Sequence, residues 1–335
     1  MSRLLRPVAA CFSPAPVTGT EVVMPVASSG PVPVLAVEGQ PLTAAPRRGR
    51  WAAVALVAAI LLWGANWPVM KVGLAHVTPL WFSALRFAAG AACLFLLQAV
   101  QGRLHLPRRA DLPVIASVGL LQMMAFTALG MEAMTILPAG RSAILSYTTP
   151  VWVAPAAILL FGERATPRRL AGIALGLAGI VVLVNPFSIP WHQPGVLGAN
   201  AMLLLAAACW ATCILHLRVH PASAYAVAPW QMLLAAIGLT LAGRIWEGTF
   251  TGDGSAAFWE ALAFVGPVAT AFCFVTVNAA STRLPATTMS MAMLGVPLAG
   301  LALSVVALGE RVDAGLAIGT VCIAGGMLIS LRQEA

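Results

Sequence analysis

The chain has 335 residues, of which 60% are hydrophobic and only 9% are charged. Because soluble domains carry about 25% charged residues, this composition leaves too few charges to cover a water-facing surface, and it excludes both a soluble enzyme and a disordered chain. The formal net charge is +8, but the arginines lie in short segments between apolar runs, and no basic patch with interleaved aromatic residues indicates nucleic-acid binding.

Residues 1–50 differ from the rest of the chain because they contain eight of its 24 prolines. A proline-rich segment without a repeat cannot build a packed core, so we expect a disordered cytoplasmic tail. The apolar stretch that follows Arg6 is broken by prolines, which is not typical of a signal peptide. Met24 is an alternative start of the coding sequence.

From Trp51 onward the chain consists of apolar runs of about 20 residues, the length that crosses the hydrocarbon core of a bilayer. Only helices satisfy their own backbone hydrogen bonds over such runs in lipid, and no dyad alternation indicates a barrel. The sequence therefore predicts an all-α polytopic membrane protein with ten transmembrane helices. Their expected ranges are 51–73, 79–100, 112–134, 139–161, 168–186, 196–217, 223–243, 257–279, 286–308 and 313–331.

The basic residues that flank these ten helices predict their orientation. With the N-terminus in the cytoplasm, the inner segments carry fourteen arginines, and the outer helix ends carry four basic residues. The positive-inside rule therefore places both termini in the cytoplasm. The inner residues are Arg3, Arg6, Arg47, Arg48, Arg50, Arg103, Arg108, Arg109, Arg164, Arg168, Arg169, Arg218, Arg283 and Arg332, and the outer ones are Lys71, Arg141, Arg244 and Arg311.

The chain repeats itself at an offset of 147 residues (210 − 63), with no gap. Each repeat holds five helices, an odd number, so the second repeat must enter the membrane in the opposite orientation. Inverted repeats are typical of secondary transporters, whose substrate sites lie near the midplane between the halves; a duplication kept only for folding is the alternative. The matching positions are Trp63 with Trp210, Lys71 with Arg218, Leu137-Pro138-Ala139 with Leu284-Pro285-Ala286, Pro150 with Pro297, Gly162-Glu163-Arg164 with Gly309-Glu310-Arg311, Gly172 with Gly319, and Gly179 with Gly326.

Short motifs follow one another along the chain, and the helix 4 pattern recurs in helix 9 of the second half. They are Leu61-Leu62-Trp63-Gly64-Ala65-Asn66-Trp67 in helix 1, Leu85-Arg86-Phe87 in helix 2, Thr148-Thr149-Pro150 and Phe161-Gly162-Glu163-Arg164 in helix 4, and Gly295-Val296-Pro297 and Leu308-Gly309-Glu310-Arg311 in helix 9. Over residues 51–331 this pattern resembles the drug/metabolite transporter superfamily, and more narrowly its EamA family of bacterial exporters. The resemblance implies two EamA-like repeats, at 51–186 and 196–331, in a bacterial inner membrane. It also implies export of small metabolites, including amino acids, and fixes no single substrate.

Tryptophans at midplane depth predict the walls of a central cavity, because membrane tryptophans normally lie at the interfaces. Trp63 and Trp67 share one face of helix 1 with Asn66, and Trp210 is the symmetry mate of Trp63. The few other midplane polar groups need a partner or water, and packing or helix–helix hydrogen bonding is the alternative role for all of these residues. The predicted substrate-binding residues are Trp63, Asn66, Trp67, Gln122, Tyr147, Trp210 and Asn278.

Three more residues are candidates for charge or gating roles. Arg86 lies about two turns inside helix 2, where it could snorkel outward, pair with Glu132 or attract an anionic group. Helix 7 carries no counterpart of Arg86, so its role is not symmetric. Pro150 and Pro297 interrupt helices 4 and 9 at symmetric depths, which fits gating, with simple curvature as the alternative.

Glycines in helices 5 and 10 have the small-x3-small spacing that favours close packing, within the chain or in a homodimer; the pairs are Gly172 with Gly176 and Gly315 with Gly319. His216 and His220 lie four residues apart without further ligands, so we expect no metal site. Neither nucleotide-binding nor hydrolase motifs occur, so we expect no cofactor and no catalytic residue.

The sequence as a whole predicts a secondary transporter that exports a zwitterionic or amphipathic small molecule by alternating access. Its expected partners are the lipid bilayer and this substrate, without nucleic acid. The alternative is a membrane-embedded enzyme that acts on a lipid-linked substrate. Such an enzyme would need a nucleophile or metal ligands near a membrane face, and the sequence offers no evident set.

Overall fold

The structure is a computed structural model that describes residues 46–163, 165–184, 195–220, 223–281, 289 and 292–331. The predicted tail lies almost entirely outside these residues, and so do Arg164, Arg283 and the triplet 284–286 of the second repeat. Every regular element in the described ranges is helical. Eight of the helical spans are long and apolar enough to cross a membrane, and two shorter apolar helices accompany them. These ten helices confirm the predicted all-α membrane fold.

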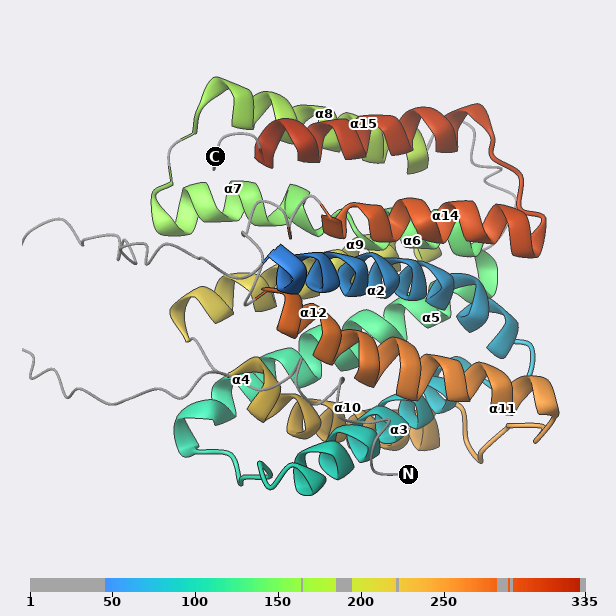
Figure 1. Ribbon diagram of the computed structural model, residues 1–335. Helices are drawn as coiled ribbons and strands as arrows, with labels where there is room; N and C mark the ends of the chain where they lie inside the picture. The colour runs from blue at the N-terminus through green and yellow to red at the C-terminus, as the bar shows by residue number, and fades with distance from the viewer. Residues whose placement is uncertain are drawn as a thin grey trace, which may run out of the picture. The chain divides into compact units, whose positions relative to one another are not determined.

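The first repeat forms five spans, of which the third is one continuous rod of different helix types and the fourth is broken (Figure 1). Its elements are α2 (Pro46–Gly73), α3 (Pro79–Val100), the rod η1 (Arg109–Asp111), α4 (Leu112–Ser117), η2 (Val118–Ala125) and α5 (Phe126–Ile136), the broken pair α6 (Ala139–Ser146) and α7 (Thr149–Phe161), and α8 (Pro167–Val184). The rod extends beyond the expected range 112–134 at both ends.

The second repeat has the same order of elements in its described part. They are α9 (Val196–Val219), α10 (Ala224–Trp246), the rod α11 (Ala256–Ala263), η3 (Phe264–Phe272) and α12 (Cys273–Ser281), then α14 (Gly295–Leu308) and α15 (Ala314–Leu331). Segments η2 and η3 are π-helices, in which each turn holds more residues than an α-turn. The offset of 147 carries η2 onto 265–272, so the two π-helices occupy matching places.

Helices α8 and α15 lie side by side, and glycines bring their backbones together (Figure 1). A Cβ atom on Gly326 would lie 2.5 Å from the carbonyl oxygen of Gly172, and one on Gly179 would lie 2.8 Å from the carbonyl oxygen of Gly319. The offset of 147 converts the first pair into the second. Such reciprocal contacts are what a two-fold relationship between the repeats produces. The glycine faces therefore pack within the chain, while a homodimer stays a prediction.

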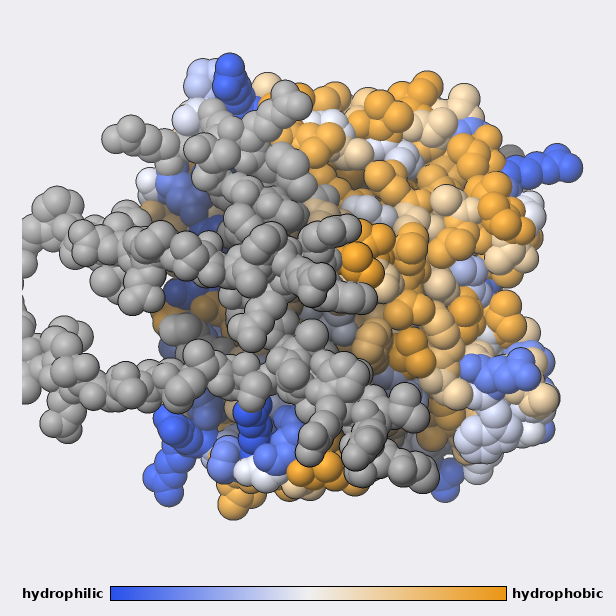
Figure 2. All heavy atoms as spheres, viewed as in Figure 1, coloured by the Kyte–Doolittle hydropathy of each residue, from blue (hydrophilic) through white to orange (hydrophobic). Residues whose placement is uncertain are grey.

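Large apolar side chains cover the sides of the helices. In Figure 2, hydrophobic residues cover most of the coloured surface to the right of the centre, and hydrophilic residues gather at the left and right edges. Leu159 and Val306, for example, are each 83% exposed. Contiguous apolar surface of this kind is stable against lipid rather than water.

Pro150 and Pro297 each lie at the beginning of a helix. Pro150 is the second residue of α7, directly after the break at Tyr147 and Thr148, and Pro297 is the third residue of α14. Proline is favoured there because the first backbone N–H groups of a helix have no intrahelical acceptor. The predicted interruption of helix 4 is therefore present as a break, and its gating role stays a prediction.

Candidate substrate-binding cavity

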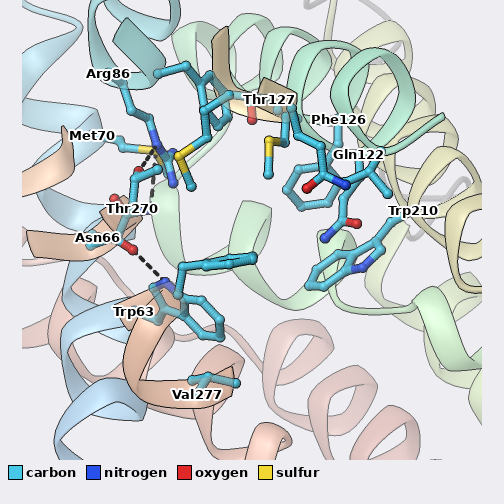
Figure 3. Close-up of a pocket in the computed structure, with 18 of the residues that line it drawn as sticks. Trp63, Asn66, Met70, Arg86, Gln122, Phe126, Thr127, Trp210, Thr270 and Val277 are labelled. Atoms are coloured by element: carbon cyan, nitrogen blue, oxygen red, sulfur yellow. Dashed lines mark hydrogen bonds between the residues drawn. The ribbon is translucent and has the colours of Figure 1, made fainter. Parts of the chain in front are cut away.

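A cavity of about 320 Å³ lies between the two repeats, and its walls come from α2, α3, α9, α10 and the third span of each repeat (Figure 3). All seven residues predicted to bind substrate line it, and so does Arg86. Pro150 and Pro297 do not line it; Pro297 borders a much smaller cavity beside α15. The residues brought together are Trp63, Asn66, Trp67, Gln122, Tyr147, Trp210 and Asn278.

One wall of the cavity is a chain of aromatic rings in edge-to-face contact. Trp67 meets Tyr147 with ring centres 6.4 Å apart, and Tyr147 meets Trp210 at 5.4 Å. Trp210 then meets Phe126 of α5 at 5.1 Å. These separations are in the range where aromatic pairs stabilise each other. The break between α6 and α7 supplies Tyr147, which joins the tryptophans of the two repeats.

The π-helix η3 holds two residues of the first repeat in place. The indole N–H of Trp63 donates a hydrogen bond of 2.6 Å to the carbonyl oxygen of Ala269, and Arg86 Nε donates one of 2.8 Å to Thr270 Oγ1. The Thr270 hydroxyl itself donates to the carbonyl oxygen of Val265, five residues earlier. π-Helices are frequent at functional sites, and both π-helices of this chain contribute residues to the cavity.

Arg86 is held without an acidic partner. Its Nη1 atom lies 3.1 Å from the sulfur of Met70, and its guanidinium carbon lies 5.4 Å from the ring centre of Phe87. Among the described residues, no Asp or Glu lines the cavity. The ion pairs among the described residues join His76 to Asp253 and Glu163 to Arg169 and Arg218, so in this conformation Arg86 is not paired with Glu132.

Several lining residues escaped the sequence analysis. Met70 could have been found, because it lies one turn after Asn66 on the same face of helix 1. Met123, Met131, Met134 and the threonines sit on the two rods with π-turns, whose faces no 3.6-residue period predicts, whereas Met232 lies on the α-helix α10. The main residues missed are Met70, Met123, Phe126, Thr127, Met131, Met134, Gln231, Met232 and Thr270.

Matching charged residues make different contacts at the two ends of the helices. Beyond α7, Glu163 pairs with Arg169 and Arg218, which lie at the end rich in arginine. At the opposite end, the mate of Glu163, Glu310, accepts hydrogen bonds from the N–H groups of Ala139 and Gly140, at 2.6 and 2.9 Å. These backbone groups belong to the start of α6.

The mate of Arg218, Lys71, also binds at the opposite end. It donates to the carbonyl oxygens of Met134 and Leu137, at the end of α5. The ends of α2 and α14 are thus both fastened to the α5–α6 turn, whereas Glu163 and Arg218 bind each other. Partial burial alone would raise the pKa of Glu163, but the hydrogen bonds from Arg169 and Arg218 outweigh it and hold this pKa below its ordinary value.

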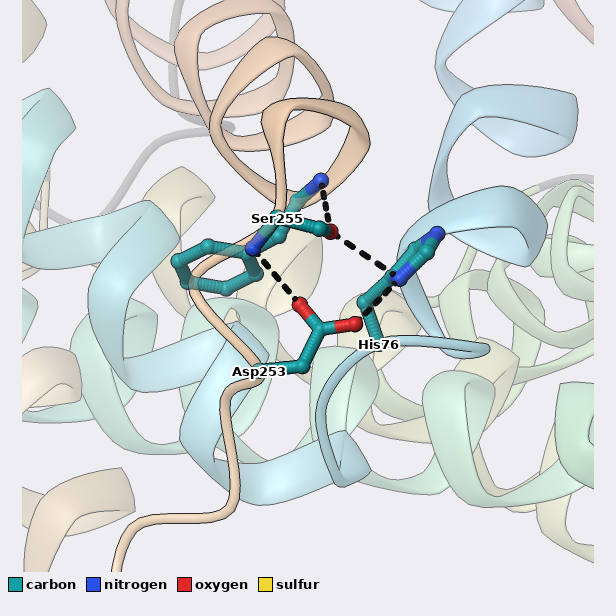
Figure 4. A network of polar contacts seen from close by, with 4 residues as sticks. His76, Asp253 and Ser255 are labelled. Carbon is teal, nitrogen blue, oxygen red and sulfur yellow. Dashed lines mark hydrogen bonds and ion pairs between the residues drawn. The ribbon is translucent and has the colours of Figure 1, made fainter.

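A His–Asp–Ser cluster occupies the loops at the opposite end (Figure 4). His76 Nδ1 lies 2.7 Å from Asp253 Oδ2 and 3.2 Å from Ser255 Oγ. A catalytic triad uses both ring nitrogens, one for the carboxylate and one for the nucleophile, but here both partners meet the same nitrogen. Ser255 Oγ also accepts the N–H of Phe258 and caps α11. The cluster therefore ties two loops together.

Asp253 is the strongest acid of this cluster. A hydrogen bond from the backbone N–H of Ser255, followed by the contact with His76, lowers the pKa of Asp253 to about 2. The carboxylate therefore stays ionised across the whole physiological pH range.

The family model of the EamA-like transporter family matches residues 50–185 and again residues 197–332. The chain belongs to this family. The uncharacterized transporter YoaV of Bacillus subtilis (strain 168) is 25% identical over 278 residues, which cover 82% of this chain and 94% of that protein. A probable amino-acid metabolite efflux pump of Salmonella typhimurium is 27% identical over 288 residues, which cover 81% and 92%.

A solved crystal structure with 23% identity covers 84% of this chain and 98% of its own, with a TM-score of 0.61. It shows that the fold is shared. The family match confirms the predicted two-repeat EamA fold, and together with the relatives named as transporters it confirms the predicted function as a membrane transporter.

Proposed function

We propose that this EamA transporter exports small amphipathic metabolites of the amino-acid class across the bacterial inner membrane, through the cavity between its repeats. The observation that carries the proposal is the cavity itself, in which an aromatic wall faces the partly buried guanidinium group of Arg86. A solute with an apolar side chain and a charged end matches both. The name of the Salmonella typhimurium relative, a probable amino-acid metabolite efflux pump, supports the same class.

The volume of the cavity and its flexible methionine side chains suit several related solutes. A volume of about 320 Å³ lies at the lower end of the 300–1,000 Å³ typical of ligand pockets, which suits a molecule of amino-acid size. Five methionines line the cavity, and unbranched thioether side chains adapt to ligands of different shape. The list is Met70, Met123, Met131, Met134 and Met232.

Alternating access explains why matching residues make different contacts at the two ends of the transmembrane helices. Lys71 and Glu310 fasten α2 and α14 to the α5–α6 turn, which closes the opposite end. The cavity meanwhile extends to Leu217 and Ala224, near the arginine-rich end. The positive-inside rule places that end in the cytoplasm, so this conformation is the one that loads substrate for export. The symmetric contacts at the cytoplasmic end form after the switch.

The proposed orientation predicts thiol accessibility in whole cells. In a variant without the six native cysteines, Thr249→Cys should react with an impermeant maleimide added outside, because residue 249 lies in the exposed loop between α10 and α11. Arg108→Cys, exposed before α4, should react only after the membrane is permeabilised. The reverse pattern would place the arginine-rich end outside and overturn the assignment of both termini to the cytoplasm.

Transport in reconstituted vesicles tests the function directly. Proteoliposomes loaded with radiolabelled leucine, methionine and phenylalanine should release at least one of them down its gradient without ATP, faster than protein-free vesicles. Vesicles with an imposed pH or Na⁺ gradient reveal coupling. Release indistinguishable from protein-free vesicles, together with turnover of a lipid-linked substrate, would contradict the proposal and favour the enzyme alternative.

A further inference from the structure

Arg86 supplies a positive charge to the wall of the cavity. Within the described part of the chain it is the one lysine or arginine that lines the cavity, and no carboxylate lines it. Isolated charges inside a membrane are costly and normally meet a counter-charge, water or a functional partner. The neutral side chains around Arg86 leave its positive charge uncompensated, so an anionic ligand group would complete the site.

The orientation of the guanidinium is fixed by a relay of hydrogen bonds. Thr270 Oγ1 accepts from Arg86 Nε at 2.8 Å, and its own proton is committed to the carbonyl oxygen of Val265, also at 2.8 Å. The hydroxyl therefore acts only as an acceptor toward Arg86. Because Nε is occupied by Thr270, the Nη atoms remain for a ligand. Thr270 is thus a positioning residue, and the π-helix η3 brings it to Arg86.

Two donors converge on one weak acceptor. Arg86 Nη1 lies 3.1 Å from the sulfur of Met70, and Asn66 Nδ2 lies 3.4 Å from the same atom. A thioether sulfur is a poor acceptor compared with a carboxylate, which binds a guanidinium through two charge-assisted hydrogen bonds. Met70 has a flexible side chain that can move aside. A ligand carboxylate in its place would receive hydrogen bonds from both donors.

The site is one-sided. The offset of 147 places Leu233 opposite Arg86 and Cys213 opposite Asn66, so the second repeat lacks this pair. Figure 3 shows Arg86, Met70 and Thr270 on one side of the cavity, with Phe126 and Trp210 on the other. A bound molecule with its acid group at Arg86 would therefore lay its apolar part against the aromatic wall.

We propose that Arg86 and Asn66 bind the carboxylate of the transported solute, and that the transporter therefore selects small apolar carboxylates over the corresponding neutral or cationic derivatives. This inference rests on the proposed function, because it assigns one subsite of the same cavity. Among the described residues, no acidic side chain lines the cavity and could bind the ammonium group of the solute. The carboxylate, rather than the amino group, is the determinant of recognition.

Matched ligands separate this role from a structural one. Isothermal titration of the purified full chain uses leucine, methionine and phenylalanine, each as the free acid and as the primary amide. A charge-assisted hydrogen bond contributes enough that the wild-type protein should bind the acids about ten- to a hundredfold more tightly than the amides. In Arg86→Gln this preference should fall to about one, while the affinity for the amides stays within about threefold and reports an intact cavity.

Four further variants complete the test. Arg86→Lys keeps the charge and should retain part of the preference. Thr270→Val should reduce the preference and Thr270→Ser should restore it, because only an oxygen acceptor holds Nε in place. Arg141→Gln is the matched control, since Arg141 donates to the carbonyl oxygens of Leu183 and Val184 and does not line the cavity; its preference should equal that of the wild type.

The outcomes distinguish this inference from the proposed function. A preference for acids that persists in Arg86→Gln would overturn the inference, since the carboxylate would then bind elsewhere. Equal wild-type affinity for acids and amides would do the same, and vesicles that still exported these solutes would leave the proposed function standing. Absence of both binding and export for the whole set would overturn the inference and the proposed function together.

Discussion

Replacing Trp210 with alanine should weaken the apparent affinity for substrate roughly five- to hundredfold while the protein stays folded. The ring forms part of the aromatic wall between Tyr147 and Phe126 and lines the cavity. Loss of one buried aromatic contact costs about 1–3 kcal/mol, which corresponds to this change in affinity. Titration of a solute that the vesicle assay shows to be exported measures the affinity, and thermal unfolding of the same preparation measures stability.

Trp63→Ala should show the same loss of affinity and a larger loss of stability. Its indole N–H donates to the Ala269 carbonyl, so the substitution also removes a hydrogen bond between the repeats, worth about 1 kcal/mol. Trp63→Phe should recover part of the affinity, because the ring remains, but none of this hydrogen bond. The two tryptophans occupy matching positions in the repeats, but we expect Trp63 to contribute more than Trp210 to the stability of the protein.

Trp246→Ala is the control, because Trp246 is 74% exposed at the end of α10 and does not line the cavity. Its affinity for substrate should equal that of the wild type. If Trp63→Ala and Trp210→Ala both lowered the unfolding temperature and left the affinity unchanged, the two tryptophans would be packing residues. The cavity would then lose its assignment as the substrate site, although the transporter fold would stand.

The sequence predicted the fold well because the repeat constrains many residues at once. One offset of 147 joins Trp63 to Trp210, and the same offset relates the two glycine contacts between α8 and α15. Apolar runs of spanning length then set the number of helices. The aromatic lining was also predictable, because a tryptophan away from the membrane interfaces needs a partner inside the protein.

The polar chemistry of the cavity was less predictable, because it depends on the π-helices. An α-helix advances by about 100° per residue, so extra residues within a π-turn rotate every later side chain to another face. Thr270 reaches Arg86 from within such a segment. A strict 3.6-residue period therefore misplaces it, and Arg86 could be recognised as a buried charge but not assigned its neighbours.

The different contacts at the two ends of the helices show a second limit of prediction from the sequence. The sequence matches Glu163 to Glu310 and Lys71 to Arg218, but the match does not tell which contacts each of them makes. A transporter that alternates between two conformations cannot make both sets of contacts at once, so any single structure must treat the matched residues differently. Under the proposed alternating access, the symmetry is a property of the whole transport cycle, and the contacts of Glu163 and Glu310 belong to one half of that cycle.

Gly326→Ala should lower the unfolding temperature by roughly 2–10 °C. The added methyl carbon would lie 2.5 Å from the Gly172 carbonyl oxygen and 2.7 Å from the Gly176 nitrogen. Both are backbone atoms, so α15 must move away from α8. Overpacking of this kind costs about 1–3 kcal/mol, and a loss of 1 kcal/mol lowers the unfolding temperature by about 2–4 °C in a chain of more than 150 residues.

The neighbouring glycine supplies the matched control. A methyl carbon on Gly325 would meet only Leu175 Cδ2 at 3.5 Å, an ordinary contact. Alanine is favoured over glycine inside a helix by up to about 1 kcal/mol, so Gly325→Ala should keep or raise the unfolding temperature. Size-exclusion chromatography of detergent-solubilised protein after heating measures the unfolding temperature of every glycine variant in one series.

The symmetry-related contact between Gly179 and Gly319 extends the test to the two-fold relationship between the repeats. Gly179→Ala should resemble Gly326→Ala, because its methyl carbon would lie 2.8 Å from the Gly319 carbonyl oxygen in the symmetry-related contact. Between lipid-facing helices, close backbone approach is the main source of association, since lipid removes the hydrophobic driving force. If Gly325→Ala and Gly326→Ala shifted the unfolding temperature equally, the residue-by-residue register of α8 against α15 would be wrong. If only Gly326→Ala were harmful and Gly179→Ala were not, the two-fold relationship between the repeats would fail at this interface.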